Sequence, residues 1–289
     1  MKILAIIVTY FPERELLEKN IAAFINDVDR VLIWENTPEE KRHVYRFIDN
    51  SKVEYCGDGI NSISHALNFA WIYAKSNGYD YLLSMDQDSL LVGFTQYLKY
   101  TVYNNDAPQG IWAPYIIESE EAIDKGAKGK KKVIPSTITS GMLVSIPIIT
   151  RVGGWNETFV IDGLDVDFCF YANRLGIKTY HFLDIYLIQS YGNSRDIHFW
   201  GRNITLRNYS PRRYYTIYRS HWLLMRMYPE QRYFGEFCKS YWAGMIKWII
   251  IFEKHGIRKF VYIIAGILSG LFCAIPKRRE PMNLLHYGS

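Results

Sequence analysis

Residues 81–89 read YLLSMDQDS, an apolar run that ends in two carboxylates two positions apart. This run is the fourth of four short apolar stretches, and each of the first three is followed by a segment whose apolar residues have helical spacing. Strict alternation of strand and helix predicts a parallel sheet with right-handed crossover connections. The sequence therefore predicts an α/β fold, with strands at 3–10, 31–34, 53–56 and 81–85 and helices at 13–26, 38–48 and 62–77.

Short polar segments follow all four predicted strands. In open α/β sheets ligands bind outside the carboxyl ends of the strands, so a binding site is expected there. The segments are Thr9-Tyr10, Glu35-Asn36, Gly57-Asp58 and Asp86-Gln87-Asp88.

Asp86 and Asp88 form the most informative of these segments. Two carboxylates at positions i and i+2 after a strand can converge on one hard cation once the chain turns. A divalent ion there could bridge a diphosphate and neutralise a departing nucleotide. The alternative is that both are ordinary turn residues, a role that Asp commonly fills. Their position after the fourth strand favours the metal site.

A second acidic cluster lies at 159–169, which reads FVIDGLDVDFC. Burying three carboxylates in so apolar a segment would be costly unless they had partners. One of them could cap the helix that is predicted over 163–175. Asp165 is the best placed of the three to take a proton from an acceptor hydroxyl in a partly desolvated cleft.

The rest of the chain gives a coarser outline. Residues 138–145 and 179–188 predict two more strands, and the polar, Lys-rich stretch 118–132 predicts a mobile surface loop. Residues 205–275 are aromatic, basic and helical in pattern, and they contain no acidic cluster.

The composition excludes several classes of protein. With 289 residues, 49% of them apolar and 22% charged, the chain can form a sizeable core and is neither disordered nor collagen-like. Its four cysteines form no CxxC pair or Cys/His cluster, so neither a disulfide framework nor a zinc site is expected, and a reducing cytosol fits. The apolar N-terminus lacks a small-residue cleavage site, which favours a buried strand over a signal peptide.

Charge is distributed unevenly along the chain. Residues 195–289 contain 16 Lys and Arg against 5 Asp and Glu, a net charge of +11, whereas residues 1–194 carry −6. A basic tail prefers phosphates, whether in nucleic acid, a nucleotide or anionic lipid. The acidic body argues against a broad nucleic-acid surface, so a diphosphate or a membrane face is the better fit.

Residues 260–275 form a run of 16 nearly uncharged residues between Arg258-Lys259 and Lys277-Arg278-Arg279. The run is shorter than the about 20 residues that a membrane span needs. Two interpretations stay open. The segment could be a core helix of a helical appendage, or it could lie in a membrane interface with its flanking cations on anionic lipid.

Taken in order, these motifs resemble those of family-2 glycosyltransferases with a GT-A-type fold, and among them the bacterial rhamnosyltransferase branch. Each motif alone is common, but the ordered set is specific, and it covers roughly residues 3–220. The set comprises VTY at 8–10, Glu35-Asn36, a helix that begins near Asn61, DQDS at 86–89, TSG at 139–141 and FVIDGLDVDFC at 159–169.

The resemblance implies a donor site along the strand ends. Asp86 would contact the nucleotide sugar, and Asp88 would join it in holding Mg²⁺ or Mn²⁺. Thr9 and Tyr10 would meet the nucleotide where the first strand ends. Glu35 would lie near the ribose or base, and Asp58 near the base.

The resemblance also implies roles for residues outside those strand ends. Asp165 aligns with the catalytic Asp of the family's ED motif and would be the base. Asp162 and Trp155 would contact the acceptor. Further donor contacts would come from a stretch of Arg and paired Tyr after the core, namely Arg212, Tyr214, Tyr215 and Arg219.

The sequence departs from the family pattern in two places. Ile60-Asn61-Ser62-Ile63 stands where the family often has NxGI before the third helix. Gln189-Ser190-Tyr191-Gly192 stands where many members have HxxG, so a His metal ligand is missing at that place.

These implications describe an inverting glycosyltransferase with a GT-A-type catalytic domain over 1–204 and a C-terminal helical appendage over 205–289. The expected donor is dTDP-rhamnose, with another UDP- or dTDP-sugar next. The expected acceptor is a growing, lipid-linked cell-surface glycan, and no nucleic-acid partner is expected. We expect a cytoplasmic bacterial protein, peripheral to the inner face of the cytoplasmic membrane.

Two other functions are compatible with such a fold. A non-catalytic scaffold that binds carbohydrate or lipid would have no need of Asp86, Asp88 and Asp165 together. A nucleotidyltransferase would normally carry a Gly-rich, basic loop after its first strand, and Tyr10-Phe11-Pro12-Glu13 is not such a loop.

Overall fold

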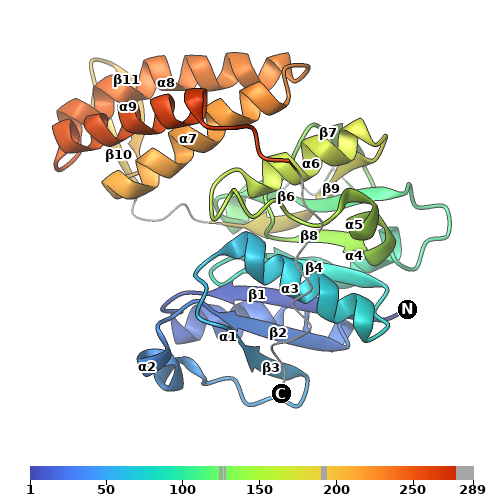
Figure 1. Cartoon of the computed structure of the whole chain (residues 1–289). Helices are drawn as coiled ribbons and strands as arrows, with labels where there is room; N and C mark the ends of the chain where they lie inside the picture. The colour runs from blue at the N-terminus through green and yellow to red at the C-terminus, as the bar shows by residue number, and fades with distance from the viewer. Residues whose placement is uncertain (124–125, 127, 190–193, 278–289) are drawn as a thin grey trace. The chain divides into compact units, whose positions relative to one another are not determined.

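A mixed β-sheet is the centre of the first of two structural units (Figure 1). The computed structural model describes residues 1–123, 126, 128–189 and 194–277. Within them, one unit comprises residues 1–160 and 164–189, and the other comprises residues 161–163 and 194–277.

Four parallel strands form one half of the sheet. β1 (Ile3–Thr9) lies between β2 (Arg30–Glu35) and β4 (Tyr81–Asp86), and β3 (Val53–Cys56) pairs with β2. The predicted strands are thus confirmed within a residue or two of their bounds. Nearly every residue of β1 and β2 is buried, as the unbroken apolar runs predicted.

The other half of the sheet contains antiparallel pairs. β8 (Met142–Ser145) pairs antiparallel with β4 on one side and with β6 (Gly110–Ile117) on the other. β6 in turn pairs in parallel with β9 (Lys178–Ile188). β5 (Leu90–Val92) and β7 (Lys131–Ile134) both pair antiparallel with β9. The order across the described sheet is β3-β2-β1-β4-β8-β6-β9-β5, with β7 beside β9.

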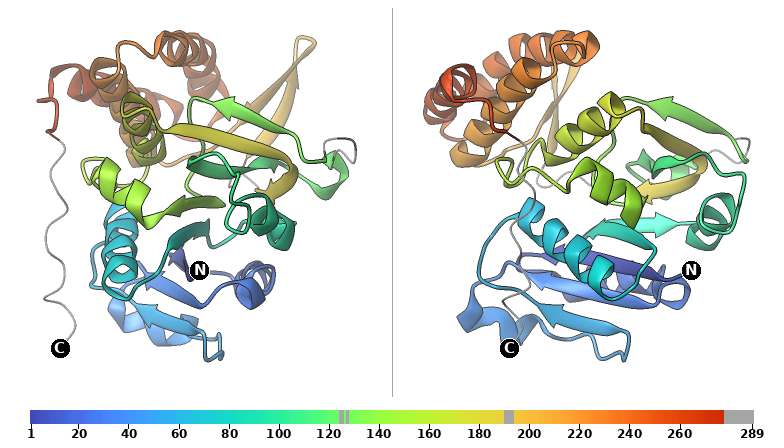
Figure 2. Two further views of the ribbon diagram at one scale, coloured as in Figure 1. Left: turned by 90° about the vertical axis from the view of Figure 1, so that its right-hand side faces the viewer. Right: turned by 45° about the vertical axis from the view of Figure 1, so that its right-hand side comes forward.

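Helices cover both faces of this sheet (Figure 2). α1 (Arg14–Ala22) and α4 (Phe94–Tyr100) pack on the face formed by the odd-numbered residues of β1. α3 (Ile63–Ser76) lies on the other face, against β1 and β4. The remaining helices of this unit are α2 (Glu39–Arg42), α5 (Ile146–Val152) and α6 (Leu164–Arg174).

Several local predictions were wrong or incomplete. The helix predicted over 38–48 is only α2 and a 3-10 turn, His43–Tyr45. The strand predicted from 138 begins at Met142, because the backbone at Thr139 and Gly141 bonds to Ser84 instead. Part of the predicted loop 118–132 lies outside the described residues, and Lys131 already belongs to β7.

The second unit is a β-hairpin followed by three helices. The hairpin consists of β10 (Arg195–Phe199) and β11 (Arg202–Leu206). The sequence analysis missed it, although Ile197, Phe199, Ile204 and Leu206 alternate with polar residues as in a strand. The helices α7 (Pro211–Met227), α8 (Arg232–Phe252) and α9 (Gly256–Phe272) were predicted only as a helical region. None of the helices in the described residues is long and apolar enough to cross a membrane.

A buried ion pair joins the helices of the second unit. Glu253 follows α8, and its carboxylate pairs with Lys259 of α9 at 2.8 Å. The Tyr214 hydroxyl of α7 donates a hydrogen bond to the same carboxylate at 2.8 Å. Burial raises the pKa of Tyr214, and the nearby Glu253 carboxylate raises it further, so the phenol stays a neutral donor. A buried charge needs such partners, and these three side chains fix α7, α8 and α9 together.

The turn after α5 offers a test of packing in the first unit. Gly153 and Gly154 both have positive φ, 81° and 74°. A Cβ at Gly153 would meet no heavy atom within 4 Å, whereas one at Gly154 would lie 2.5 Å from Asn68 Oδ1 and 2.8 Å from the Trp71 ring. The loop therefore docks on α3 only because Gly154 lacks a side chain.

Replacing these glycines by Ala separates backbone strain from this close contact. Gly153→Ala should lower the free energy of unfolding by about 1 kcal/mol, the usual strain of a left-handed residue. Gly154→Ala should cost at least about 1 kcal/mol more, because the added methyl group overpacks the core. Urea unfolding measures both. Equal losses for the two variants would contradict the docking described here.

Candidate functional site

The carboxyl ends of β1, β2 and β4 meet at one edge of the sheet. Thr9 is paired in register with Glu35, and Val8 with Asp86. The Thr9 hydroxyl donates to the Trp34 carbonyl at 3.2 Å, and the Asn36 backbone N–H donates to the Thr9 carbonyl at 2.8 Å. The structure thus brings together three of the strand ends that the sequence singled out.

Asp86 is held from several sides. Its backbone N–H donates to the Ser140 hydroxyl at 3.0 Å, and its carbonyl accepts from the Asn20 amide at 2.5 Å. Its Oδ2 accepts a hydrogen bond from Gln189 Nε2 at 3.0 Å. The Ser89 hydroxyl donates a hydrogen bond to the oxygen of the same side-chain amide, Gln189 Oε1, at 3.1 Å. Gln189 therefore orients the Asp86 carboxylate; residues 190–192, which follow it in the altered HxxG segment, lie outside the described residues.

Asp88 is exposed in the turn between β4 and β5. The preceding residue, Gln87, fixes this turn to the end of β1. Its Oε1 accepts from the Tyr10 backbone N–H at 2.7 Å, and its Nε2 donates to the Tyr10 carbonyl at 3.2 Å. Tyr10 itself is 51% exposed, so its ring is open to a ligand.

The described residues contain no group of three or more His, Cys, Asp and Glu that could hold a metal ion. Asp86 and Asp88 are the carboxylates that an ion would meet at the end of β4. Mg²⁺ is commonly bound through one or two carboxylates together with substrate phosphates, so the chemistry of this pair fits such an ion.

Glu35 is already engaged by a cation. Its carboxylate is 3% exposed and pairs with the Arg46 guanidinium, at 2.6 Å from Nη2 and 3.0 Å from Nε. The hydrogen bond to Glu35 raises the pKa of Arg46. Arg46 also lies over the Tyr55 ring, 5.7 Å from its centroid. Glu35 thus positions Arg46 in this structure, and a direct contact with a ribose would require the pair to open.

Asp58 contacts a histidine that the sequence analysis did not single out. His65 lies on the first turn of α3, and its Nε2 is 2.7 Å from Asp58 Oδ2. Its Nδ1 lies 3.6 Å from Glu157 Oε2. Glu157 and Asp58 raise the pKa of His65, although burial of the ring works in the opposite direction. The charged imidazolium is favoured between these two carboxylates.

The same network reaches Trp155. Asn68 donates from Nδ2 to the Trp155 carbonyl at 2.9 Å and to Glu157 at 2.8 Å, and it accepts from the Trp155 backbone N–H at 2.8 Å. His65 lowers the pKa of Glu157, and the bond from Asn68 also contributes to that shift. The Trp155 ring is 3% exposed and stacks on Phe168, so an acceptor contact would require that it be uncovered.

Asp165 lies in the first turn of α6 and is half-buried. Its Oδ1 accepts a hydrogen bond from the Val166 backbone N–H at 2.8 Å. Asp167, two residues later, is fully buried. Of these two carboxylates only Asp165 is open enough to meet a substrate.

Asp162 belongs to the second unit, where it faces Arg213 at 3.4 Å. Burial raises the pKa of Asp162, whereas the guanidinium of Arg213 lowers it. Arg213 also stacks on Tyr209, at 4.4 Å from the ring centroid.

The predicted donor residues of α7 also lie in this second unit. Arg212 is exposed on the first turn. The Tyr215 hydroxyl donates to Ser269 of α9 at 3.0 Å. The Arg219 backbone carbonyl faces Gly270 of α9, and a Cβ added to Gly270 would lie 2.5 Å from that carbonyl oxygen.

Sequence reasoning missed His65, Asn68, Glu157 and Arg46. His65 and Asn68 are three residues apart on α3 and are both buried, and the other residues from Ala66 to Ala74 are apolar. Two polar residues on one buried helix face are a usable signal. Glu157 and Arg46 gave no comparable signal, because exposed charged residues in loops are common.

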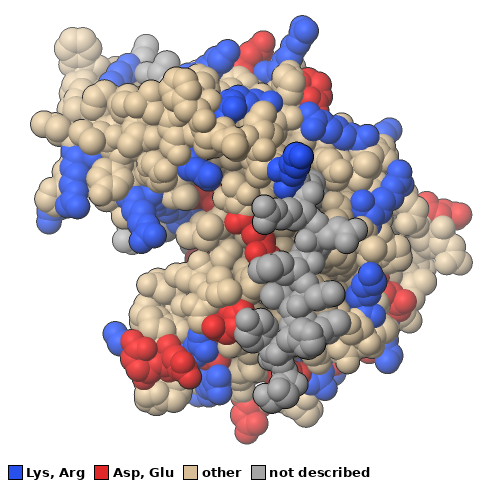
Figure 3. All heavy atoms as spheres, in the orientation of Figure 1, with Lys and Arg blue, Asp and Glu red and all other residues tan. Residues whose placement is uncertain are grey.

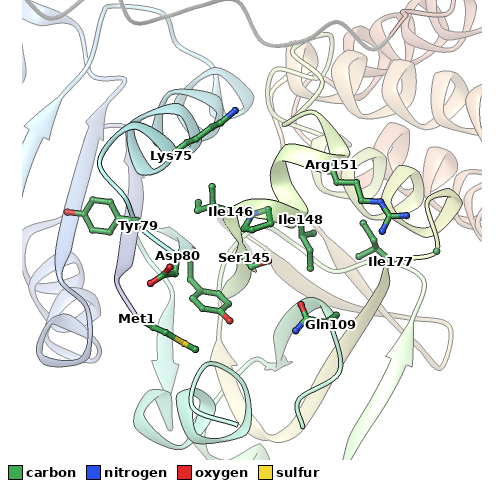
Figure 4. Close-up of a pocket in the computed structure, with 13 residues that line it drawn as sticks. Met1, Lys75, Tyr79, Asp80, Gln109, Ser145, Ile146, Ile148, Arg151 and Ile177 are labelled. Carbon is green, nitrogen blue, oxygen red and sulfur yellow. The ribbon is translucent and has the colours of Figure 1, made fainter. Parts of the chain in front are cut away.

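A cavity of about 660 Å³ lies at the opposite edge of the sheet, near the amino ends of β1 and β4 (Figure 4). Met1, Asp80, Gln109 and Ser145 are among the residues around it. Because ligands of α/β sheets bind at the other edge, this cavity is not part of the candidate site.

Comparisons with known proteins support the fold described above. No family model matches the chain. Among curated proteins, the chain is similar to the dTDP-rhamnosyl transferase RfbF of Shigella flexneri, with 27% identity over an alignment of 246 residues that covers 78% of this chain and 80% of that protein.

Solved structures show the same fold. The crystal structure of GalNAc-T7 with UDP, GalNAc and Mn²⁺ matches with a TM-score of 0.55 and 10% identity over 78% of this chain. The match covers 47% of the GalNAc-T7 chain, about half of its length. TarS 1–349 of S. aureus in complex with UDP-GlcNAc matches with a TM-score of 0.53 and 12% identity, over 94% of this chain and 82% of that one. The chain thus has the fold of the GT-A glycosyltransferases and is similar to the family-2 rhamnosyltransferases, as its motifs predicted.

Proposed function

We propose that this chain is a glycosyltransferase that moves a sugar from a nucleotide-diphosphate donor to a hydroxyl group of a glycan acceptor. The observation that carries the proposal is the register of three parallel strands, which brings Thr9, Glu35 and Asp86 to one edge of the sheet. Nucleotides bind at such edges. The similarity to RfbF supports the same class of reaction.

The donor that we propose is dTDP-rhamnose. The support is the name of the curated relative, a dTDP-rhamnosyl transferase. TarS was solved with UDP-GlcNAc and GalNAc-T7 with UDP, so another UDP- or dTDP-sugar is the next candidate. The nucleotide would lie against Thr9 and the exposed Tyr10 ring, with Asp58 and the Glu35–Arg46 pair near the base and ribose.

Asp86 and Asp88 would hold Mg²⁺ or Mn²⁺ together with the donor diphosphate. The structure of GalNAc-T7, which has a similar fold, was solved with Mn²⁺, and this supports a divalent ion in this type of site. Gln189 is neutral, so its hydrogen bond orients the Asp86 carboxylate and leaves its charge available. When bound, the ion would neutralise the charge that develops on the departing diphosphate.

Asp165 would act as the general base. The acceptor hydroxyl would give its proton to the Asp165 carboxylate while its oxygen forms a bond to the anomeric carbon. The bond from that carbon to the diphosphate oxygen would break, and the diphosphate would leave with the electron pair. Attack from the side opposite the leaving group inverts the anomeric configuration.

The proposal includes the other residues that the resemblance singled out. Arg212, Tyr215 and Arg219 on α7 are proposed to bind the donor, since guanidinium groups suit diphosphates. Asp162, beside Arg213, and Trp155 are proposed to bind the acceptor. The acceptor that we propose is a lipid-linked cell-surface glycan.

Replacing Asp88 tests the metal site. Asp88→Asn should weaken binding of dTDP by at least about tenfold in Mn²⁺, since even indirect partners of a metal contribute about 10-fold to 100-fold. In EDTA the same variant should bind dTDP as the wild type does. Isothermal titration calorimetry measures both conditions.

The matched control is Asp106→Asn, an exposed loop carboxylate of the same unit, which should bind normally in both conditions. An equal loss for Asp88→Asn in Mn²⁺ and in EDTA would make Asp88 a structural turn residue.

Replacing Asp165 tests the base. Asp165→Asn keeps the size of the side chain but cannot accept the proton, so kcat should fall by about 10²–10⁴ while the donor Kd changes little. The readout is sugar transfer in a steady-state assay, with donor binding measured in parallel. Asp162→Asn and Asp167→Asn are the comparison variants. If Asp165→Asn keeps more than about a tenth of the wild-type turnover, the proton goes elsewhere.

A further inference from the structure

The outward face of α9 is apolar along its whole length. Ile257 is 76% exposed, Val261 58%, Leu268 49% and Phe272 81%, and Ile264 lies on the same side at 39%. Successive members are three or four residues apart, so they form one stripe along the helix. We call these five residues the α9 stripe.

The opposite face of α9 is unusual for its small residues. Gly266 and Gly270 face α7, and a Cβ at either position would lie 2.5 Å from a backbone carbonyl of that helix. Ile263 is buried on the same side, in the core of the second unit. A surface helix of a soluble protein normally buries its large apolar residues and exposes polar ones. Here α9 exposes the five large apolar residues of the stripe and buries its glycines.

An exposed apolar patch of this kind marks an interaction surface. Exposed cations lie at both ends of the stripe: Lys254 and Arg258 at its start, and Lys277 after its end. From residue 254 to residue 279 the sequence contains no Asp or Glu. Lys259 is the one cation of α9 that is neutralised, by Glu253. In Figure 3 the surface over α9, at the upper left, is mostly uncharged, with Lys and Arg side chains at its margins.

This pattern fits an anionic lipid surface better than a second copy of the chain. A symmetric pair formed through the stripe would bring its cationic margins close together, whereas lipid phosphates would neutralise them. The helix has 17 residues, about 25 Å at 1.5 Å per residue, and it does not qualify as a membrane span. An exposed apolar face with cations at its ends can lie along a membrane interface, with the apolar residues among the acyl chains and the cations at the headgroups.

We infer that α9 lies in the interface of an anionic phospholipid bilayer, with the α9 stripe among the acyl chains and Lys254, Arg258 and Lys277 at the phosphates. Of the two interpretations left open for residues 260–275, the core helix describes the inner face of α9, and the inference assigns the outer face to lipid. The inference does not depend on the proposed function, because it rests on the second unit alone.

Vesicle flotation tests the inference with the full chain. Wild-type protein should float with vesicles of phosphatidylglycerol and phosphatidylcholine, bind vesicles of phosphatidylcholine alone at least about tenfold less, and be released in part by high salt. The triple variant Val261→Ser, Leu268→Ser, Phe272→Ser should lose at least about tenfold in partitioning, since each side chain gives up buried apolar area.

The matched control is Val44→Ser with Tyr103→Ser, two exposed apolar residues of the first unit, 62% and 61% exposed. This control should bind vesicles as the wild type does. Thermal unfolding and dTDP binding should be unchanged in the triple variant, because all three side chains are exposed. A second variant, Lys254→Gln with Arg258→Gln, keeps the stripe. Its binding to the vesicles with phosphatidylglycerol should fall, and its weak binding to vesicles of phosphatidylcholine alone should stay as in the wild type.

Three results would overturn the inference. One is a wild-type chain that does not float with anionic vesicles. Another is a triple variant that floats as well as the wild type. The third is a wild-type chain that is a dimer in light scattering and a triple variant that is a monomer. That result would assign the stripe to contact with a second copy.

Discussion

The parallel register of β1 between β2 and β4 is the constraint on which the site depends. It sets Thr9 opposite Glu35 and Val8 opposite Asp86, so three loops leave the sheet at one edge. Gln87 ties two of these loops together through the Tyr10 backbone. A shift of β4 by one residue would turn the Asp86 side chain to the other face of the sheet and break the bond to Gln189.

The parts of this architecture with a local signal could be predicted from the sequence. Short apolar runs predicted β1 to β4, and the polar residues after them predicted the edge of the sheet where a ligand would bind. The antiparallel pairings could not be predicted in the same way, because a pairing such as β5 with β9 joins residues about a hundred positions apart. Pro114 adds a further irregularity, since β6 shifts register next to it.

The candidate site shows the same limit. Asp86, Asp88 and Asp165 were identified because carboxylates after an apolar run are conspicuous. The groups that orient the site come from distant positions: Gln189 is 103 residues from Asp86, and Glu157 is 92 residues from His65 in the chain. The sequence of α9 contains no charged residue after Lys259, so the pattern alone does not distinguish an inner face from an outer one. Only the packing of Gly266 and Gly270 against α7 shows which face is turned outward.

The central claim is that Asp86 and Asp88 form the metal and diphosphate site at this edge. Anomalous X-ray scattering from crystals grown with Mn²⁺ and dTDP tests it most directly. The account predicts a manganese peak within direct coordination distance of Asp86 or Asp88, with both phosphates of dTDP beside it and the nucleoside against Thr9 and Tyr10. A bound nucleotide whose phosphates and manganese lie away from these two carboxylates would contradict it.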